Sequence, residues 1–405
     1  MEKIRKPCPW AKECGGCRYQ GIEYSKQLRK KQAGIERLLS GFGNVSRIIG
    51  MDDPYHYRNK VHRAFTKDGS GNIISGPYEE GSHWIIDVKH CLIEDEDCQK
   101  AAEAVKGLIK EMRVPVYNEK TGHGVIRRCL IRKGLATGEI MAVIVTGGKF
   151  AGAREFAKAL KERCPRINTI ILNLNEKRSS MILGDKEEVL YGLGFIRDRL
   201  CGLDFQLTSK SFYQVNPAQT EVIYKKAMEF ARLEGGEKVI DAYCGIGTIG
   251  LTAAKCLDPS GQVIGIELNR ESISCARKNA ELNNITNARF ITGDAGTIMK
   301  EMAAGGERAD VIFMDPPRSG ASISFMKAAI RMKPSRIVYI SCGPESLARN
   351  LKFFRENGYE AEKIQPIDNF PFTQHVETVC LLSNRKRKPD SYVKVSLDME
   401  DYYRI

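Results

Sequence analysis

The stretch of sequence that decides the fold is DAYCGIGTIG, residues 241–250. It follows the apolar run KVI at 238–240 and opens the helical pattern GTIGLTAAKCL at 247–257. Its glycines give the motif GxGxxG, in which missing side chains let the backbone approach a ligand. The pattern therefore predicts a nucleotide-type site at a strand-to-helix turn, with a tight turn of no further function as the plain structural alternative.

Downstream of this turn, apolar strands alternate with helical stretches. Further strands are expected in QVIGIELN (262–269), ARFITGDA (288–295), DVIFMDPPR (310–318) and RIVYISCGP (336–344), with helical patterns between them. This rhythm is typical of an α/β fold with a Rossmann-like, doubly wound parallel sheet. The end differs, because AEKIQPIDNF (361–370) and HVETVCLLSN (375–384) have no helix between them, which predicts an antiparallel hairpin at the sheet edge.

Upstream, the chain has a cysteine-rich start at 8–20 and a helical pattern over 22–39. Short strands separated by glycine turns are expected at 58–69, 71–81 and 83–88. Residues 125–205 suggest further antiparallel strands, including one at 179–185, and a helix at 151–163. We therefore expect an N-terminal cysteine segment with a helix (1–49), a β-rich α+β central domain that binds RNA (50–205), a catalytic domain (206–385) and a charged tail (386–405).

Composition points to a polyanionic partner outside membranes. The 405 residues carry a formal net charge of +13, from 63 basic and 50 acidic side chains, which favours nucleic acid. No apolar run is long enough to span a bilayer, and the N-terminus lacks the core of a signal peptide, so we expect a cytoplasmic protein. Thirteen cysteines are an odd number for a disulfide framework, so thiols, metal ligands or nucleophiles are expected.

Two acids indicate which nucleotide the glycine turn binds. Glu267 lies about twenty residues beyond the motif, where it can hold ribose hydroxyls of NAD or of S-adenosylmethionine. Asp241 ends the first strand, where an acid suits a cationic sulfonium, and Asp315 ends the fourth, held by two following prolines. These acids favour S-adenosylmethionine, and an NAD-linked iron–sulfur oxidoreductase is the alternative.

Three cysteines near the N-terminus have the spacing of metal ligands. Cys8, Cys14 and Cys17 form C-x5-C-x2-C, with two glycines between the second and third that let the loop wrap closely. Three thiolates need a fourth ligand, and both an iron–sulfur cluster and a closed zinc site accept four.

Taken in order, DAYCGIGTIG, IELN, GDA, DPPRSG, SCGP and HVET resemble the RNA uracil-5 methyltransferases, from Cys8 to about Asn384. That family includes ribosomal and transfer RNA 5-methyluridine enzymes. The resemblance implies a monomeric, class I S-adenosylmethionine-dependent enzyme. The layout is closer to the 23S rRNA type, with the tRNA T-loop as the alternative substrate. Related enzymes often carry an N-terminal RNA-binding β-barrel, which this chain is expected to lack, so phosphate contacts should come from its other domains.

The resemblance also implies the binding residues. The expected cofactor contacts are Gln214, Tyr243, Gly245, Glu267, Asp294 and Asp315, with a helix N-cap as the alternative role of Asp294. The fourth cluster ligand is expected to be Cys91, with Cys98 as the fallback, which gives a 4Fe-4S cluster rather than zinc.

Methylating C5 of uracil needs a nucleophile and a base. Adding a thiolate to C6 makes C5 nucleophilic, and a base must later remove the C5 proton. Cys342 follows a strand whose carboxyl end borders the ligand crevice, and Glu377 enters an apolar strand where desolvation would make it more basic. The competitors are Cys244 and His375. Arg318 is a loop charge that could bind RNA, and Cys380 is expected to lie in the core.

Overall fold

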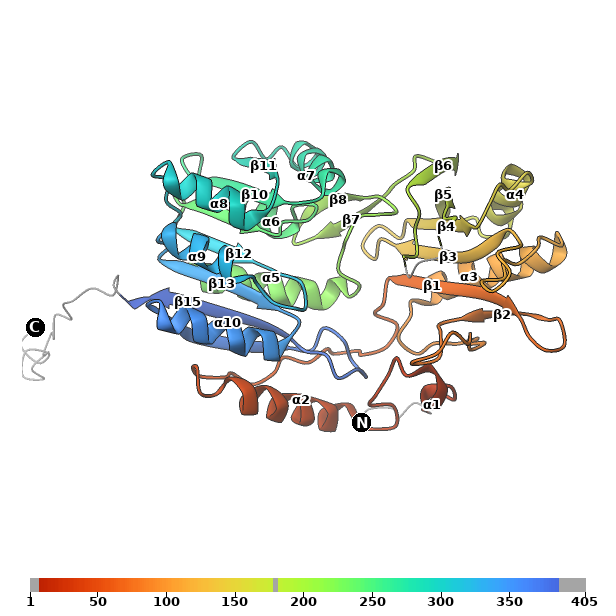
Figure 1. Cartoon of the computed structure of the whole chain (residues 1–405), viewed down its shortest axis with the longest axis horizontal. Helices are drawn as coiled ribbons and strands as arrows, with labels where there is room; N and C mark the ends of the chain where they lie inside the picture. The colour runs from red at the N-terminus through yellow and green to blue at the C-terminus, as the bar shows by residue number, and fades with distance from the viewer. Residues whose placement is uncertain (1–6, 178–180, 386–405) are drawn as a thin grey trace, which may run out of the picture.

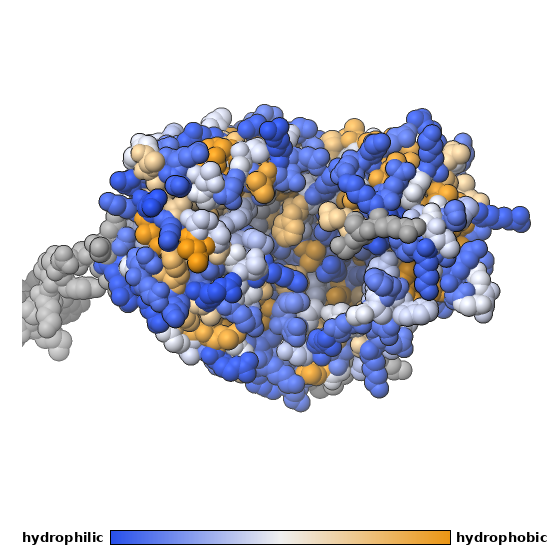
Figure 2. Space-filling model, viewed as in Figure 1, coloured by the Kyte–Doolittle hydropathy of each residue, from blue (hydrophilic) through white to orange (hydrophobic). Residues whose placement is uncertain are grey.

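The computed structural model describes residues 7–177 and 181–385, so the predicted charged tail lies outside the described residues. Two large β-sheets, each with its own helices, lie side by side along the long axis of the molecule (Figure 1), and the face seen in this view is mostly hydrophilic (Figure 2). The N-terminal segment, with helices α1 (Ala11–Cys14) and α2 (Tyr24–Leu39), runs beneath both. Among the described residues, no helix is both long and apolar enough to cross a membrane.

The C-terminal sheet has seven strands in the order β11-β10-β9-β12-β13-β15-β14. The strand pairings are parallel except at β15, which runs antiparallel to both neighbours. The doubly wound fold with an antiparallel edge hairpin is thus confirmed. The strands are β9 (Lys238–Ala242), β10 (Gln262–Glu267), β11 (Ala288–Thr292), β12 (Val311–Met314), β13 (Arg336–Ser341), β14 (Tyr359–Ile367) and β15 (Glu377–Asn384).

Helices bury both faces of this sheet. Successive residues of a strand point to opposite faces, so Val239 and Ile240 of β9 enter two different hydrophobic clusters. Ile35 and Leu39 of α2 join the second cluster, which fixes the N-terminal helix to this domain. The helices are α5 (Pro217–Ala231), α6 (Thr248–Ala254), α7 (Arg270–Leu282), α8 (Ala295–Ala304), α9 (Ile323–Arg331) and α10 (Pro344–Glu356).

The central sheet has six strands in the order β2-β1-β3-β4-β5-β6. Helices α3 (Glu96–Glu111) and α4 (Ala153–Arg163) share one apolar cluster with its strands, for example through Val105, Phe156 and Ile144. The strands are β1 (Lys60–Lys67), β2 (Ile73–Gly76), β3 (Ile126–Lys133), β4 (Ile140–Thr146), β5 (Ile167–Leu174) and β6 (Lys186–Tyr191).

Several sequence-based expectations for this domain were wrong. β4 and β5 pair in parallel, because α4 carries the chain back across the sheet between them. The expected strand at 83–88 is only an isolated bridge between Tyr78 and Ile85, and the described part of 179–185 contains no strand, since β6 starts at Lys186. The helix α3 was not expected.

A hairpin joins the two domains. β7 (Ile196–Leu200) and β8 (Leu203–Leu207) place Ile196 and Phe205 in the same apolar cluster as Val239 of the C-terminal sheet. Arg132 of β3 then donates hydrogen bonds to the carbonyl oxygens of Thr208 (2.9 Å) and Ser211 (2.7 Å). The expected domain boundary after residue 205 falls inside β8.

Candidate active site

Asp241 lies buried at the carboxyl end of β9. Its Oδ2 accepts a hydrogen bond from the Gly250 N–H at 2.7 Å, and a Cβ at position 250 would meet that oxygen at 2.8 Å. Its Oδ1 is buried with no hydrogen-bond partner among the described residues. Burial raises the pKa of Asp241 to about 8, so the site holds an acid without a compensating cation.

The glycine turn is held by the acid at the end of β10. Gly245 adopts a φ of 54° and donates its N–H to Glu267 Oε2 at 3.2 Å. Glu267 Oε1 accepts the Asn269 N–H at 2.9 Å, so one carboxylate links two neighbouring turns. Tyr243, with a φ of 64°, stacks at an angle against Phe325, with ring centroids 5.1 Å apart.

Of the remaining expected cofactor residues, Asp294 and Asp315 lie close to Tyr243. Asp294 is the N-cap of α8, accepting the Thr297 N–H at 2.8 Å, and its charge raises the pKa of Tyr243 after the larger effect of burial. The pairing of Met314 with Ala242 places Asp315 beside Tyr243. Burial raises the pKa of Asp315 to about 7. Gln214 lies half-buried between β8 and α5.

The strand register brings Cys342 and Glu377 together. Ser341 at the end of β13 pairs with Thr378 of β15, so the next residue of one strand faces the preceding residue of the other. Because β15 is antiparallel, its first residue lies at the carboxyl edge of the parallel strands. Two residues that are 35 positions apart in sequence thereby share one edge of the sheet.

The pKa values of Cys342 and Glu377 are both raised, and both depend on the charges of Asp315 and Arg318. Burial raises the pKa of Glu377 to about 8, the Asp315 charge adds to the rise, and Arg318 opposes it. Glu377 Oε2 is buried without a partner in the described part of the chain. Burial, followed by the charges of Glu377 and Asp315, raises the pKa of the Cys342 thiol to about 11, and Arg318 again opposes the rise.

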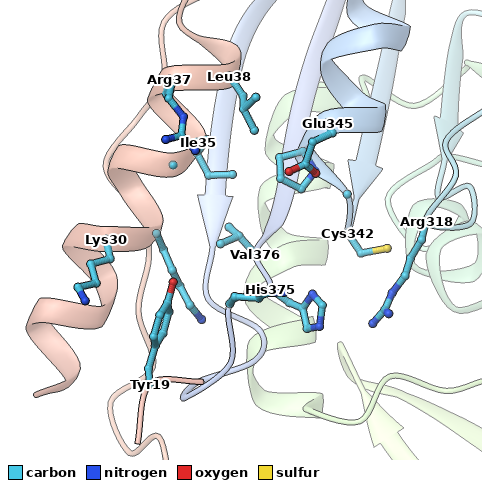
Figure 3. Close-up of a pocket in the computed structure, with 15 residues that line it drawn as sticks. Tyr19, Lys30, Ile35, Arg37, Leu38, Arg318, Cys342, Glu345, His375 and Val376 are labelled. Atoms are coloured by element: carbon cyan, nitrogen blue, oxygen red, sulfur yellow. The ribbon is translucent and has the colours of Figure 1, made fainter. Parts of the chain in front are cut away.

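The competing residues have different surroundings. Cys244 and Cys380 are buried, 4% and 0% exposed, each inside an apolar cluster. His375 is half-buried, and burial followed by the charges of Arg318 and Lys31 lowers its pKa. Figure 3 shows the His375 ring beside the end of the Arg318 side chain and below the Cys342 sulfur, and His375 lines a cavity of about 430 Å³.

The loop that precedes Glu377 is fixed by a buried ion pair that the sequence reasoning missed. Lys31 of α2 donates to Asp368 Oδ1 at 2.6 Å, and both side chains are fully buried. The Tyr24 hydroxyl donates to Asp368 Oδ2 at 3.0 Å, and the Tyr57 hydroxyl to the Pro371 carbonyl at 3.1 Å. A lysine within the apolar spacing of α2 was the available signal for a buried partner.

The cysteine segment lies next to the same loop. Cys17 and Cys91 pack against a small cluster that contains Phe372, and Cys8 and Cys14 each influence the ionisation of Cys17. The Gly16 position is in contact with Cys14, since a Cβ there would lie 3.5 Å from its Sγ. Among the described residues, however, no three His, Cys, Asp or Glu side chains are placed to hold a single metal ion. The fallback ligand, Cys98, is buried in the separate α3 cluster.

Known proteins resemble this chain over nearly its whole length. A family model described as tRNA (uracil-5-)-methyltransferase matches residues 23–385. Uncharacterized RNA methyltransferases of Halalkalibacterium halodurans and Caldanaerobacter subterraneus are 41% and 40% identical, each over 94% of this chain and 84% and 85% of the relative. The crystal structure of Pyrococcus abyssi tRNA (uracil-54, C5)-methyltransferase with S-adenosyl-L-homocysteine aligns with a TM-score of 0.76 and 31% identity, covering 91% of this chain and 85% of that one. The chain therefore belongs to the tRNA (uracil-5-)-methyltransferase family of RNA methyltransferases.

Proposed function

We propose that this protein transfers the methyl group of S-adenosylmethionine to C5 of a uridine in RNA, with Cys342 as nucleophile and Glu377 as base. The observation that carries the proposal is the β13–β15 register, which pairs a thiol and a buried carboxyl group at the carboxyl edge of a doubly wound sheet. Ligands of such sheets bind at this edge.

The residues at the edge fit a cationic methyl donor. The unpartnered Oδ1 of Asp241 and the raised pKa values of Asp241 and Asp315 indicate carboxyl groups that a nearby positive charge would stabilise. The P. abyssi relative was crystallised with S-adenosyl-L-homocysteine, the product of the same donor. The proposed contacts are Gln214, Tyr243, Gly245, Glu267, Asp294 and Asp315. A thermal-shift assay separates this proposal from an NAD-linked oxidoreductase. The proposal predicts stabilisation by S-adenosylmethionine and none by NAD, and the oxidoreductase predicts the reverse.

The chemistry then divides between two side chains. The bound donor supplies an electrophilic methyl group on a sulfonium. Cys342 gives its proton to solvent and adds as a thiolate to C6 of the uracil ring, which places negative charge on C5. C5 then takes the methyl group, and the bond between that methyl group and the donor sulfur breaks to leave S-adenosylhomocysteine. Glu377 then removes the C5 proton, the C5–C6 double bond reforms, and the bond between C6 and the sulfur of Cys342 breaks. A carboxylate with a pKa near 8 is a stronger base than an exposed one.

The central domain is the proposed RNA-binding domain. Lys60 and His62 lie two positions apart on β1, on the same face, and Lys60 pairs across the sheet with Arg132 of β3. Burial, then the charges of Arg132 and Arg58, lowers the pKa of Lys60 to about 8. Arg132 is itself buried and bonded to backbone carbonyl oxygens, so the half-buried Lys60 ammonium is the group that an RNA phosphate would stabilise.

We propose ribosomal RNA as the substrate on the resemblance of the cysteine cluster and layout to the ribosomal enzymes. Transfer RNA is the second candidate, because the family model and the P. abyssi relative both carry that description. Mapping 5-methyluridine by mass spectrometry in 23S rRNA and tRNA, from cells with and without this protein, decides between them. Loss of the modification from neither RNA would contradict the proposed function.

We also propose that Cys8, Cys14, Cys17 and Cys91 hold a 4Fe-4S cluster. Burial raises the pKa of Cys17 to about 11 and of Cys91 to about 12, with smaller contributions from neighbouring cysteine charges. Thiols in that setting become thiolates readily only when a metal centre compensates their charge. Anaerobically purified protein should contain about four iron atoms for each chain. Stoichiometric zinc without iron would favour the alternative metal.

A further inference from the structure

The cavity next to the nucleophile has a second wall that the proposed chemistry does not use. Its volume is about 430 Å³, within the range of pockets that bind small ligands. One wall is the turn at Cys342 with the start of α10, and the other is α2 together with Tyr19. Figure 3 shows the Cys342 sulfur turned toward Arg318, away from α2. The space between the Cys342 turn and α2 thus lies on the other side of the turn from the one to which the sulfur points.

Positive charge surrounds this space. Lys30 and Arg37 of α2 and Arg318 of the facing loop are exposed, and none of the three has an ion-pair partner within residues 7–177 and 181–385. Lys30 lies over the ring of Tyr19, 5.9 Å from its centroid. Glu345 is the one acid in the lining. Lys31 is the third basic residue that α2 contributes to the lining, and its charge is neutralised by the buried Asp368.

A glycine keeps the α2 wall open. Lys30, Gly34 and Arg37 follow at i, i+4 and i+7, so they share one face of the helix. A Cβ added at Gly34 would have nothing within 4 Å, so no close packing requires glycine there. Glycine inside a helix is less stable than alanine, and a tight turn is absent at this position. The feature that glycine does provide is free volume between two cations.

We propose that α2 and the Cys342 turn form a subsite for the nucleotide adjacent to the target uridine, with Lys30 and Arg37 binding the RNA phosphates. The inference rests on the proposed function for the identity of the neighbouring uridine, but the binding of phosphate can be tested without turnover. Tyr19 lines the same wall, with the Lys30 ammonium over its ring. In this arrangement the N-terminal segment determines the path along which the RNA strand brings a uridine to Cys342.

The test measures binding of a fluorescein-labelled decauridylate by anisotropy across a salt series. Each single-strand phosphate contact contributes about 0.7 to the slope of log affinity against log salt, so Lys30→Gln/Arg37→Gln should flatten the slope by about 1.4. Lys26→Gln/Arg29→Gln is the matched control, because it removes the same charge from the same helix outside the cavity lining. Equal flattening by both pairs, or none by the first, would overturn the subsite.

Filling the cavity gives a second test. Gly34→Leu should lower kcat/KM for RNA at least tenfold while stabilisation by S-adenosylmethionine stays unchanged. Ala33→Leu, at an exposed position of the same helix outside the cavity lining, should leave kcat/KM unchanged. Unchanged kcat/KM in Gly34→Leu would contradict the proposal. If no RNA is methylated by the wild type but the salt slopes differ as expected, the proposed function fails and the subsite stands.

Discussion

At the scale of single residues, Cys342 and Glu377 are expected to act in separable halves of the reaction. Cys342→Ala should abolish turnover and leave no covalent RNA adduct. Glu377→Gln keeps size and hydrogen bonding but cannot accept the C5 proton, so a methylated RNA–protein adduct should accumulate. A denaturant-stable band that carries label from the methyl group is the measurement. Normal turnover by Glu377→Gln would transfer the base role to His375, and an adduct in Cys342→Ala would transfer the nucleophile role to Cys244.

The raised pKa of Glu377 also predicts how the stability of the fold depends on pH. Its pKa is about 8 in the folded protein, against an ordinary value near 4.5. The folded state therefore binds the proton more tightly, and this contribution to stability, present below pH 4.5, is lost as pH rises through about 8. Each pKa unit corresponds to about 1.4 kcal/mol. Ligand-free Glu377→Gln should thus lose less Tm than wild type between pH 5 and 8, and parallel curves would show that the carboxyl group is already ionised at pH 5.

At the scale of elements, β15 shows what the sequence could and could not predict. The absence of a helix between 370 and 375 was enough to predict an antiparallel hairpin. The register that places Glu377 opposite the Cys342 turn depends on side-chain packing across the sheet, so it required the structure. The parallel pairing of β4 with β5 was missed because apolar runs look alike in parallel and antiparallel sheets until the intervening helix is placed.

The Lys31–Asp368 pair illustrates a limit of a different kind. Its partners are 337 positions apart, and no local pattern specifies such a contact. Lys31→Ala should lower the free energy of unfolding by about 3–5 kcal/mol, because Asp368 would stay buried without its counter-ion. The double variant Lys31→Met/Asp368→Asn should recover much of the loss. Urea unfolding monitored by circular dichroism measures both, and an effect below 1 kcal/mol for Lys31→Ala would show that the pair is solvated.

At the scale of the whole molecule, the cysteine segment lies where it can support both domains. Cys17 and Cys91 pack with Tyr57 of the central domain and Phe372 of the loop before Glu377. We expect Cys14→Ser to lower Tm and the iron content together, while single-turnover methylation by the protein that stays folded changes less than tenfold. A loss of the chemical step with unchanged Tm and iron content would instead give the segment a direct part in the reaction.

The contacts of the loop before Glu377 also affect when, during synthesis of the chain, the residues of the candidate active site come together. The Phe372 N–H donates to Gln27 Oε1, a partner 345 positions earlier, and the Lys31 contact spans a similar separation. At about 5–20 residues per second, α2 leaves the ribosome roughly 15–70 s before that loop exists. A helix of 16 residues is marginal alone, so α2 must wait as a fluctuating segment with its lysine still hydrated. We therefore expect the loop that leads to Glu377 to take its final position only when these two distant parts of the nascent chain meet.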